Sequence, residues 1–165
     1  QHRMRDYPLS PEEIQKFLAE SQAGTIATVG PDGVPYCVPV HFVHVDGAVY
    51  FHGLPAGQKL DYIRADPKVC FTVYELHQLL MDLEERPCFT DTAYTSVVIQ
   101  GKAALLTDLV EKERALMTIV QKYTPQLVEK GLSEARVRGT AVVKITAEHI
   151  TGNITGGKEK TARAA

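Results

Sequence analysis

The sequence predicts a mainly β domain with peripheral helices, built as a closed or nearly closed antiparallel barrel of about six strands. Three observations favour this fold class. β-Branched and aromatic residues gather in runs of strand length, such as residues 68–74 and 140–150. Turns and short loops separate most of these runs, as in an antiparallel sheet. Helical patterns occur only at the start, in the middle and near the end of the chain, where they would decorate a barrel.

Composition is that of an ordinary globular domain. The chain has 165 residues, of which 44% are hydrophobic and 23% charged, so it can form one domain with a sizeable core. We expect that domain over residues 1–150 and a polar, partly disordered tail over residues 151–165. A formal charge of -2 argues against nucleic-acid binding, and no apolar run could cross a membrane or form a signal peptide. We therefore expect a cytoplasmic protein.

Three cysteines, Cys37, Cys70 and Cys88, lack the close spacing of a metal or redox motif. An odd number of cysteines is typical of reduced thiols in a reducing compartment. Residues 75–88 contain carboxylate, histidine and cysteine side chains, but no pair has the usual ligand spacing. We expect no metal site.

The first element is a short amphipathic helix. Ser10 can accept from the free amides of the first turn, Pro11 suits the first helical position, and Glu13 completes a capping box. Apolar residues within 14–18 then share one face. A β-branched strand over residues 25–29 and a turn lead from this helix into the central hairpin.

Residues 34–59 carry the hairpin around which the chain is organised. Asp46-Gly47 between two β-rich runs predicts a primed turn, because such turns need positive φ. The second strand covers residues 48–52, and a Gly- and Pro-containing loop then leads to Lys59. Side chains of the first strand alternate, with Val38, Val40 and Phe42 on one face and Pro39, His41 and Val43 on the other.

Beyond the hairpin, two strands are expected on either side of a long loop. A short helix over residues 58–64 precedes a strand over 68–74. The mixed apolar and charged residues 75–92 predict a loop with at most one helical turn. Residues 93–106 predict a long strand, in which Gly101 indicates a bulge or sharp bend.

The last third of the chain predicts helix, helix and strand. Asp108 and Glu111 resemble a capping box before a strong apolar stripe that ends near Pro125. Residues 126–138 form a weaker helical pattern, and residues 140–150 predict the final strand.

Several short motifs follow one another in this chain: PYCVPVHF, a D-G turn, VYFH, GLPAGQK before a short helix, DPKVCFTV, and YTSVVIQGKA. Their order and spacing resemble the FMN-binding split-barrel family, the superfamily of pyridoxamine 5'-phosphate oxidase-like proteins. Within it, the chain is similar to the nitroimidazole-resistance (Nim-type) flavoproteins. The resemblance covers residues 10–106 and implies a six-stranded antiparallel split β-barrel.

The resemblance also implies a homodimer with FMN at the subunit interface. The strand at residues 38–40 would lie beside the isoalloxazine, Phe51 and His52 near the ribityl chain and phosphate, Lys59 on the phosphate, and Ser96 on a facing strand. The full set of cofactor-binding positions that it implies is Val38, Pro39, Val40, Phe51, His52, Lys59, Tyr94 and Ser96.

Physical chemistry agrees with the role of Lys59. A lysine after a Gly-containing loop, where a helix begins, combines a cation with free backbone amides, which suits a phosphate. Without the family context, a solvated lysine on a surface helix would be the commoner case. His52 and His41 are the candidate catalytic groups, because histidine titrates near neutral pH. A half-buried strand histidine and a barrel-surface histidine are the alternatives.

Together these features predict an FMN-dependent oxidoreductase that passes electrons from reduced flavin to a small organic acceptor of the nitroaromatic type. Two alternatives keep the barrel: a flavin- or haem-binding module without turnover, and a reductase that uses the deazaflavin F420. The chain ends without the basic segment of pyridoxamine phosphate oxidases proper, so we do not expect that activity.

Overall fold

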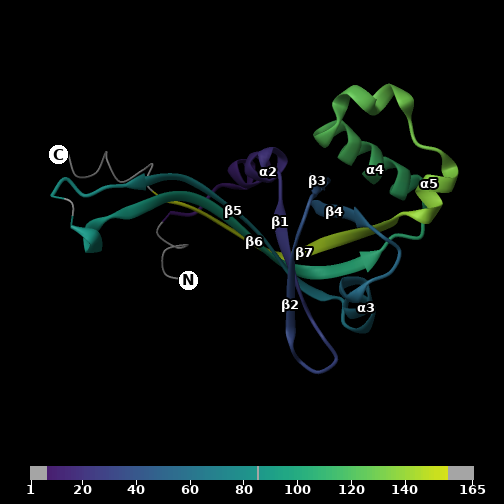
Figure 1. The fold of residues 1–165 in the computed structure, drawn as a ribbon, viewed down its shortest axis with the longest axis horizontal. Coiled ribbons are helices and arrows are strands. Elements are labelled where there is room, and N and C mark those ends of the chain that lie inside the picture. The colour runs from purple at the N-terminus through teal and green to yellow at the C-terminus, as the bar shows by residue number, and fades with distance from the viewer. Residues whose placement is uncertain (1–6, 85, 156–165) are drawn as a thin grey trace.

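A computed structural model describes residues 7–84 and 86–155, which form one antiparallel sheet of seven strands with helices around it (Figure 1). The strand order is β2-β1-β5-β6-β7-β4-β3. The strands are β1 (Gly24–Val29), β2 (Pro35–Val40), β3 (Val43–Val45), β4 (Ala48–Gly53), β5 (Lys68–Leu80), β6 (Asp91–Leu105) and β7 (Ala141–Ile154). The helices are α2 (Pro11–Glu20), α3 (Gln58–Ala65), α4 (Leu109–Tyr123) and α5 (Glu134–Gly139), with 3₁₀ turns η1 (Pro87–Phe89) and η2 (Pro125–Lys130).

The sheet curls until its two edges approach each other. β2 and β3 stand at opposite ends of the strand order, yet only His41 and Phe42 separate them in the chain. Three residue steps span at most about 11 Å, so the two edge strands must lie close together. This is the geometry of a nearly closed barrel, and it confirms the predicted fold class. Seven strands form it, because the first hairpin strand is broken in two at His41.

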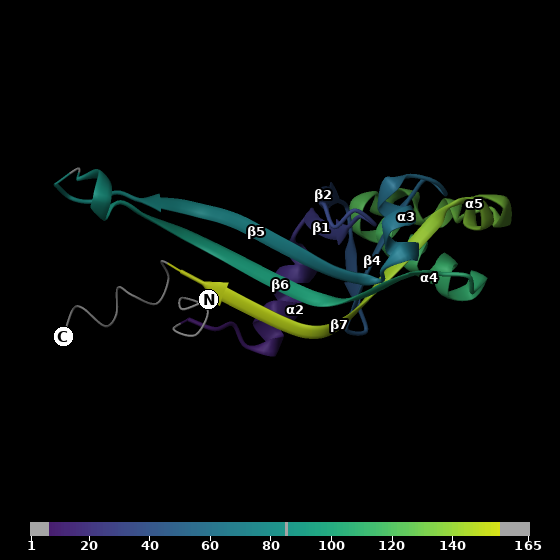
Figure 2. The ribbon, with the colours of Figure 1, turned by 90° about the horizontal axis from the view of Figure 1, so that it is seen from below.

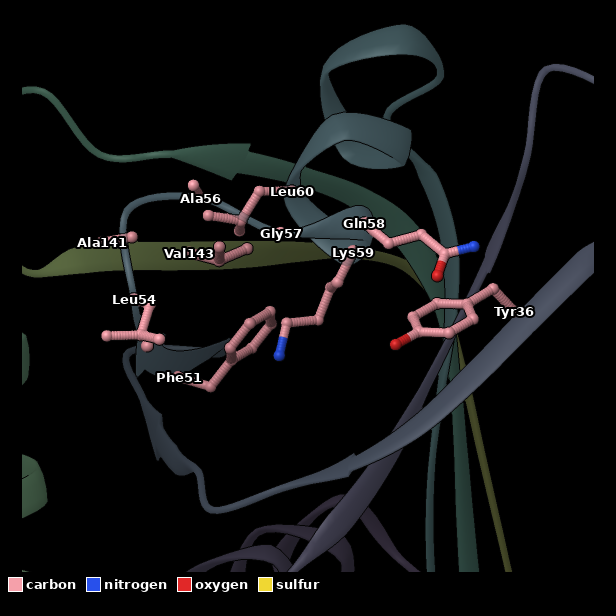
Figure 3. A pocket seen from close by; sticks show the side chains of 11 residues that line it. Tyr36, Phe51, Leu54, Ala56, Gly57, Gln58, Lys59, Leu60, Ala141 and Val143 are labelled. Carbon is pink, nitrogen blue, oxygen red and sulfur yellow. The ribbon is translucent and has the colours of Figure 1, made fainter.

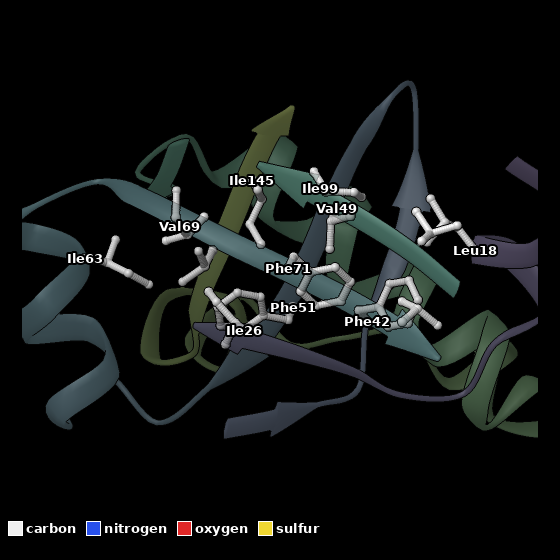
Figure 4. Close-up of a cluster of buried hydrophobic side chains, with 14 of the residues drawn as sticks. Leu18, Ile26, Phe42, Val49, Phe51, Ile63, Val69, Phe71, Ile99 and Ile145 are labelled. Carbon is white, nitrogen blue, oxygen red and sulfur yellow. The ribbon is translucent and has the colours of Figure 1, made fainter. Parts of the chain in front are cut away.

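The core fills the inside of this barrel. Phe42, Phe51 and Phe71 are at most 1% exposed, and the first and last pack edge to face with centroids 5.0 Å apart. Figure 4 shows these rings meeting Ile26 from β1 and Ile145 from β7. Buried side chains from five strands, α2 and α3 therefore join in one cluster, which also includes Leu18, Val49, Leu60, Ile63, Val73, Val97, Ile99 and Val143.

The C-terminal end of α4 fixes the break between β2 and β3. The Tyr123 hydroxyl accepts from the Phe42 N–H at 2.9 Å and lies 2.8 Å from the carbonyl oxygens of Phe42 and Gln22. Lys122 Nζ donates to the Phe42 carbonyl at 3.1 Å. Because the chain leaves one sheet edge here and joins the other, these side chains replace the ladder hydrogen bonds that Phe42 lacks.

The turn at Asp46-Gly47 is confirmed, with φ of 50° and 75°. The predicted bulge at Gly101 is confirmed too, because the β6–β7 register shifts between Gln100 and Gly101. A Cβ at Gly101 would overlap the carbonyl of Thr146, so only glycine fits where the strands approach.

The predicted loop over residues 75–92 is wrong. β5 continues to Leu80 and β6 begins at Asp91, so residues 74–84 and 86–96 form a long hairpin that we call the arm. Figures 1 and 2 show it projecting far beyond the barrel. The alternation of buried and exposed residues in β5 stops at Val73, because no side chain of β5 beyond that residue is buried.

The final strand is also longer than predicted, since β7 reaches Ile154. Residues 151–154, expected in a polar tail, are therefore ordered strand. The rest of that predicted tail, beyond Thr155, lies outside the described residues.

Candidate functional site

A pocket of about 250 Å³ lies between the end of β4 and the start of α3. Phe51 and Leu60 form its apolar wall, Lys59 reaches in from α3, and Tyr36 closes it from β2. Figure 3 shows the Lys59 chain running across the pocket to the Phe51 ring, with the Tyr36 hydroxyl directed into the same space. The remaining lining residues are Gly53, Leu54, Ala56, Gly57, Gln58, Ala141 and Val143.

Lys59 is a half-buried cation without a carboxylate partner among the residues that the structure describes. Its Nζ lies 5.1 Å from the centroid of the Phe51 ring. Burial lowers the pKa of Lys59 from its usual range. A bound anion would reverse that effect, since it favours the charged ammonium. The pocket therefore contains a partly desolvated positive charge that an anion would stabilise.

The start of α3 adds backbone donors to the same pocket. Gly57 precedes the helix with φ of 138°, a conformation that favours glycine, and no side chain caps the helix. A Cβ at Gly57 would meet only open space, so a ligand can approach this backbone. Uncapped amides at a helix N-terminus bind anions, and phosphate above all.

Tyr36 and Gln58 line the pocket but were missed by the sequence analysis. Tyr36 packs edge-on against Tyr62 with centroids 5.9 Å apart, and Gln58 Nε2 donates to the Tyr62 hydroxyl at 2.7 Å. The sequence does contain a signal for Tyr36: side chains of a strand alternate between its two faces, which places Tyr36 on the same face of β2 as Val38 and Val40.

His52 does not share the pocket of Lys59. Successive residues of a strand point to opposite faces, so Phe51 faces the Lys59 pocket while His52 faces α4. There it lines a second cavity, also of about 250 Å³. Burial, and secondarily the charge of His41, lower the pKa of His52. His41 stacks at 5.0 Å on the Tyr123 ring, on the same side of the barrel.

The strand at residues 38–40 is likewise outside the Lys59 pocket. Val38 and Val40 are partly buried and pack against the barrel core, and Pro39 is exposed. β2 is an edge strand that pairs only with β1, which is where a proline is tolerated.

Tyr94 and Ser96 lie in the arm, far from Lys59 in the same chain. Val143, which lines the pocket, pairs with Leu105, nine residues along β6 from Ser96. At 3.3 Å per residue the separation is about 30 Å. One chain therefore cannot bring these two residues to its own Lys59 pocket.

Comparisons with known proteins agree with this fold. The family model for pyridoxamine 5'-phosphate oxidase matches residues 10–154. A curated protein of Rhizobium meliloti (strain 1021), RA0666, is 34% identical over 67 residues, and this match spans 41% of the chain and only 43% of that protein. No helix in the described part of the chain is both long and apolar enough to cross a membrane.

Two solved structures are similar over most of the chain. A candidate 5-nitroimidazole antibiotic resistance protein from Bacteroides thetaiotaomicron is 26% identical with a TM-score of 0.74, covering 88% of this chain and 84% of that one. An FAD-binding protein from Mesorhizobium loti is 25% identical with a TM-score of 0.65, covering 90% and 97%. The chain thus belongs to the pyridoxamine 5'-phosphate oxidase family, as the order of its motifs predicted.

Proposed function

We propose that this protein binds FMN, with the flavin phosphate held by Lys59 and the backbone amides at the start of α3. The observation that carries the proposal is a half-buried ammonium, unpaired with any described carboxylate, beside an uncapped helix N-terminus. A flavin phosphate has close to two negative charges, and both features favour a group of that charge. The similarity to an FAD-binding protein supports a flavin as the ligand.

The size of the pocket supports a binding site that is completed by a second copy of the chain in a homodimer. About 250 Å³ is smaller than the roughly 300 to 1,000 Å³ of sites that enclose a whole drug-sized ligand. The pocket therefore fits one end of the cofactor, and the rest would extend beyond this chain. A second copy could supply Tyr94 and Ser96 from its arm, since the arm of the same chain lies too far away.

We further propose that the protein is an oxidoreductase. The bound flavin would supply the redox chemistry, passing electrons to a small organic acceptor of the nitroaromatic type. The similarity to the Bacteroides protein supports that choice of acceptor. His52 and His41 lie on the α4 side of the barrel, so we place their proposed catalytic role beside the acceptor and not at the phosphate.

The phosphate assignment is tested by comparing FMN with riboflavin, which lacks the phosphate. Wild-type protein should bind FMN more tightly than riboflavin, measured by quenching of flavin fluorescence. Lys59→Ala should weaken FMN binding at least tenfold, because a charge-assisted contact contributes about 1.5 to 3 kcal/mol, and riboflavin binding should be unchanged.

The matched control is Lys16→Ala, which removes an exposed lysine of α2. Equal FMN affinity in Lys59→Ala and Lys16→Ala would show the assignment to be wrong. Mass spectrometry of the small molecule released on denaturation separates FMN from FAD, haem and F420.

A further inference from the structure

The cavity on the helix side of β4 has the composition of a binding site of its own. Its wall is apolar and comes from α4, where Leu116, Ile119 and Val120 lie at helical spacing. The polar residues that line it are His52, Arg136 and Thr140. Small-molecule sites combine such an apolar wall with a few convergent polar groups.

Arg136 is the distinctive member of this set. Its neighbour Arg138, on the same short helix, donates from Nε to Glu134 at 2.9 Å. Arg136 makes no ion pair within residues 7–84 and 86–155, and it lines the cavity. The backbone around it is held in place, because the Arg136 carbonyl accepts from the Thr140 hydroxyl at 2.8 Å. An arginine without an ion-pair partner suits a carboxylate, which its guanidinium can bind through two parallel hydrogen bonds.

From this arrangement we infer that the cavity binds a small organic anion, a carboxylate on a compact aromatic or branched apolar body. The carboxylate would contact Arg136, and the apolar body would lie against Leu116, Ile119 and Val120. A volume of about 250 Å³ limits the body to something smaller than a drug-sized ligand, so a flavin or a haem does not fit.

This site is separate from the Lys59 pocket. His52 and Phe51 are successive residues of β4 and face opposite sides of the β4–β7 pair. Burial lowers the pKa of His52, so above neutral pH its ring is uncharged and Arg136 is the cation available to the ligand. Binding at this cavity does not depend on whether the protein also binds FMN.

Benzoate is a suitable probe, because it combines a carboxylate with a flat apolar ring. We would titrate full-length protein with benzoate at pH 7.5 and follow the His52 ring signals by NMR, with calorimetry for the affinity. Arg136→Gln should weaken benzoate binding at least tenfold, whereas Arg138→Gln should change it less than twofold. Benzamide, which has the same shape without the charge, should bind at least tenfold more weakly than benzoate.

A second variant tests the cavity itself. Val120→Phe places a larger ring in the apolar wall and should abolish benzoate binding while thermal unfolding shows that the fold is kept. Equal binding by Arg136→Gln and Arg138→Gln, or by benzoate and benzamide, would overturn the inference, as would full binding by Val120→Phe. Lys59→Ala should still bind benzoate, so failure of the FMN proposal is distinguishable from failure of this one.

Discussion

The two halves of strand β5 experience opposite environments. Phe71 and Val73, inside the barrel, are 0% and 1% exposed, whereas Tyr74, Leu76 and Leu79, in the arm, are each more than half exposed. β1 pairs with β5 only as far as Thr72, so beyond that residue the described chain places no strand along this edge. In the barrel half, the chain buries these apolar side chains and pairs β5 with a strand on each side. In the arm half, the apolar side chains are exposed and β5 pairs with β6 alone among the described strands.

A bulge gathers the apolar side chains of the arm on one face. Residues paired across an antiparallel ladder share a face, and Tyr74, Leu76 and Leu79 pair with residues 96, 94 and 92 of β6. The register shift beside His77 puts Leu79 on this face, where regular alternation would place Gln78. The result is an exposed apolar face of the kind that marks an interaction site. We therefore propose this face as the contact for a second copy.

The largest difference between the two halves should appear in stability. Phe71→Ala should lower the free energy of unfolding by about 3 to 5 kcal/mol, because it leaves a cavity among fully buried rings. Tyr74→Ala, three residues away, should cost about 1 kcal/mol or less, since that side chain is exposed, although its ring lies against Tyr94 with centroids 5.3 Å apart. Urea unfolding of both variants measures the contrast. Similar losses for the two would mean that the arm is as well packed as the barrel.

The arm should matter more for assembly than for folding. The double variant Leu76→Glu/Leu79→Glu places two charges on the apolar face and should weaken dimerisation at least tenfold, or about 1.4 kcal/mol. Sedimentation velocity over a range of concentrations measures this, and near-UV circular dichroism checks that the barrel is intact.

Val110→Glu is the control for the arm variant, because Val110 is 78% exposed but lies on α4. A wild-type monomer, or a double variant that dimerises as well as Val110→Glu, would contradict the assignment of the arm as the dimer contact.

Local signals in the sequence were read correctly because local physics determines them. Ser10 and Glu13 make both hydrogen bonds of the predicted capping box, at 3.2 and 2.7 Å. Lys59 stands at the start of a helix beside a pocket, as its Gly-containing loop indicated. These features depend on a few neighbouring residues, so a single sequence is enough to predict them.

Features that depend on distant partners could not be predicted in the same way. β5 lacks alternation beyond Val73 because no side chain of its arm part is buried, and a strand without alternation looks like a loop. The break at His41 depends on Tyr123, which is 81 residues from Phe42 in the chain. The resemblance placed His52 near the phosphate, but only the packing of α4 shows that its side chain occupies a different cavity.

The smallest expected effect is on the pH dependence of stability, and it follows from comparing a histidine of the arm with a histidine of the barrel. In the arm, His77 Nε2 lies 2.8 Å from the Thr95 hydroxyl, whereas in the barrel His44 Nε2 is buried without a partner among the described residues. Burial, and then the charge of Lys122, lower the pKa of His44. As the pH falls, the unfolded chain therefore takes up the proton before the folded chain does. The contribution of the neutral His44 ring to the free energy of unfolding is fully present above about pH 6.5 and declines below it.

Replacing His44 with leucine should flatten this pH dependence, because the variant has neither the titrating ring nor the unpartnered nitrogen. Urea unfolding at pH 7.5 and 5.5 should show a larger loss of stability on acidification in the wild type than in His44→Leu. The difference should stay below about 1 kcal/mol, since water screens a ring that is only partly buried. His52 shares the same direction of shift, so some pH dependence should persist in the variant. An equal loss in both proteins would mean that His44 takes up its proton as readily in the folded barrel as in the unfolded chain.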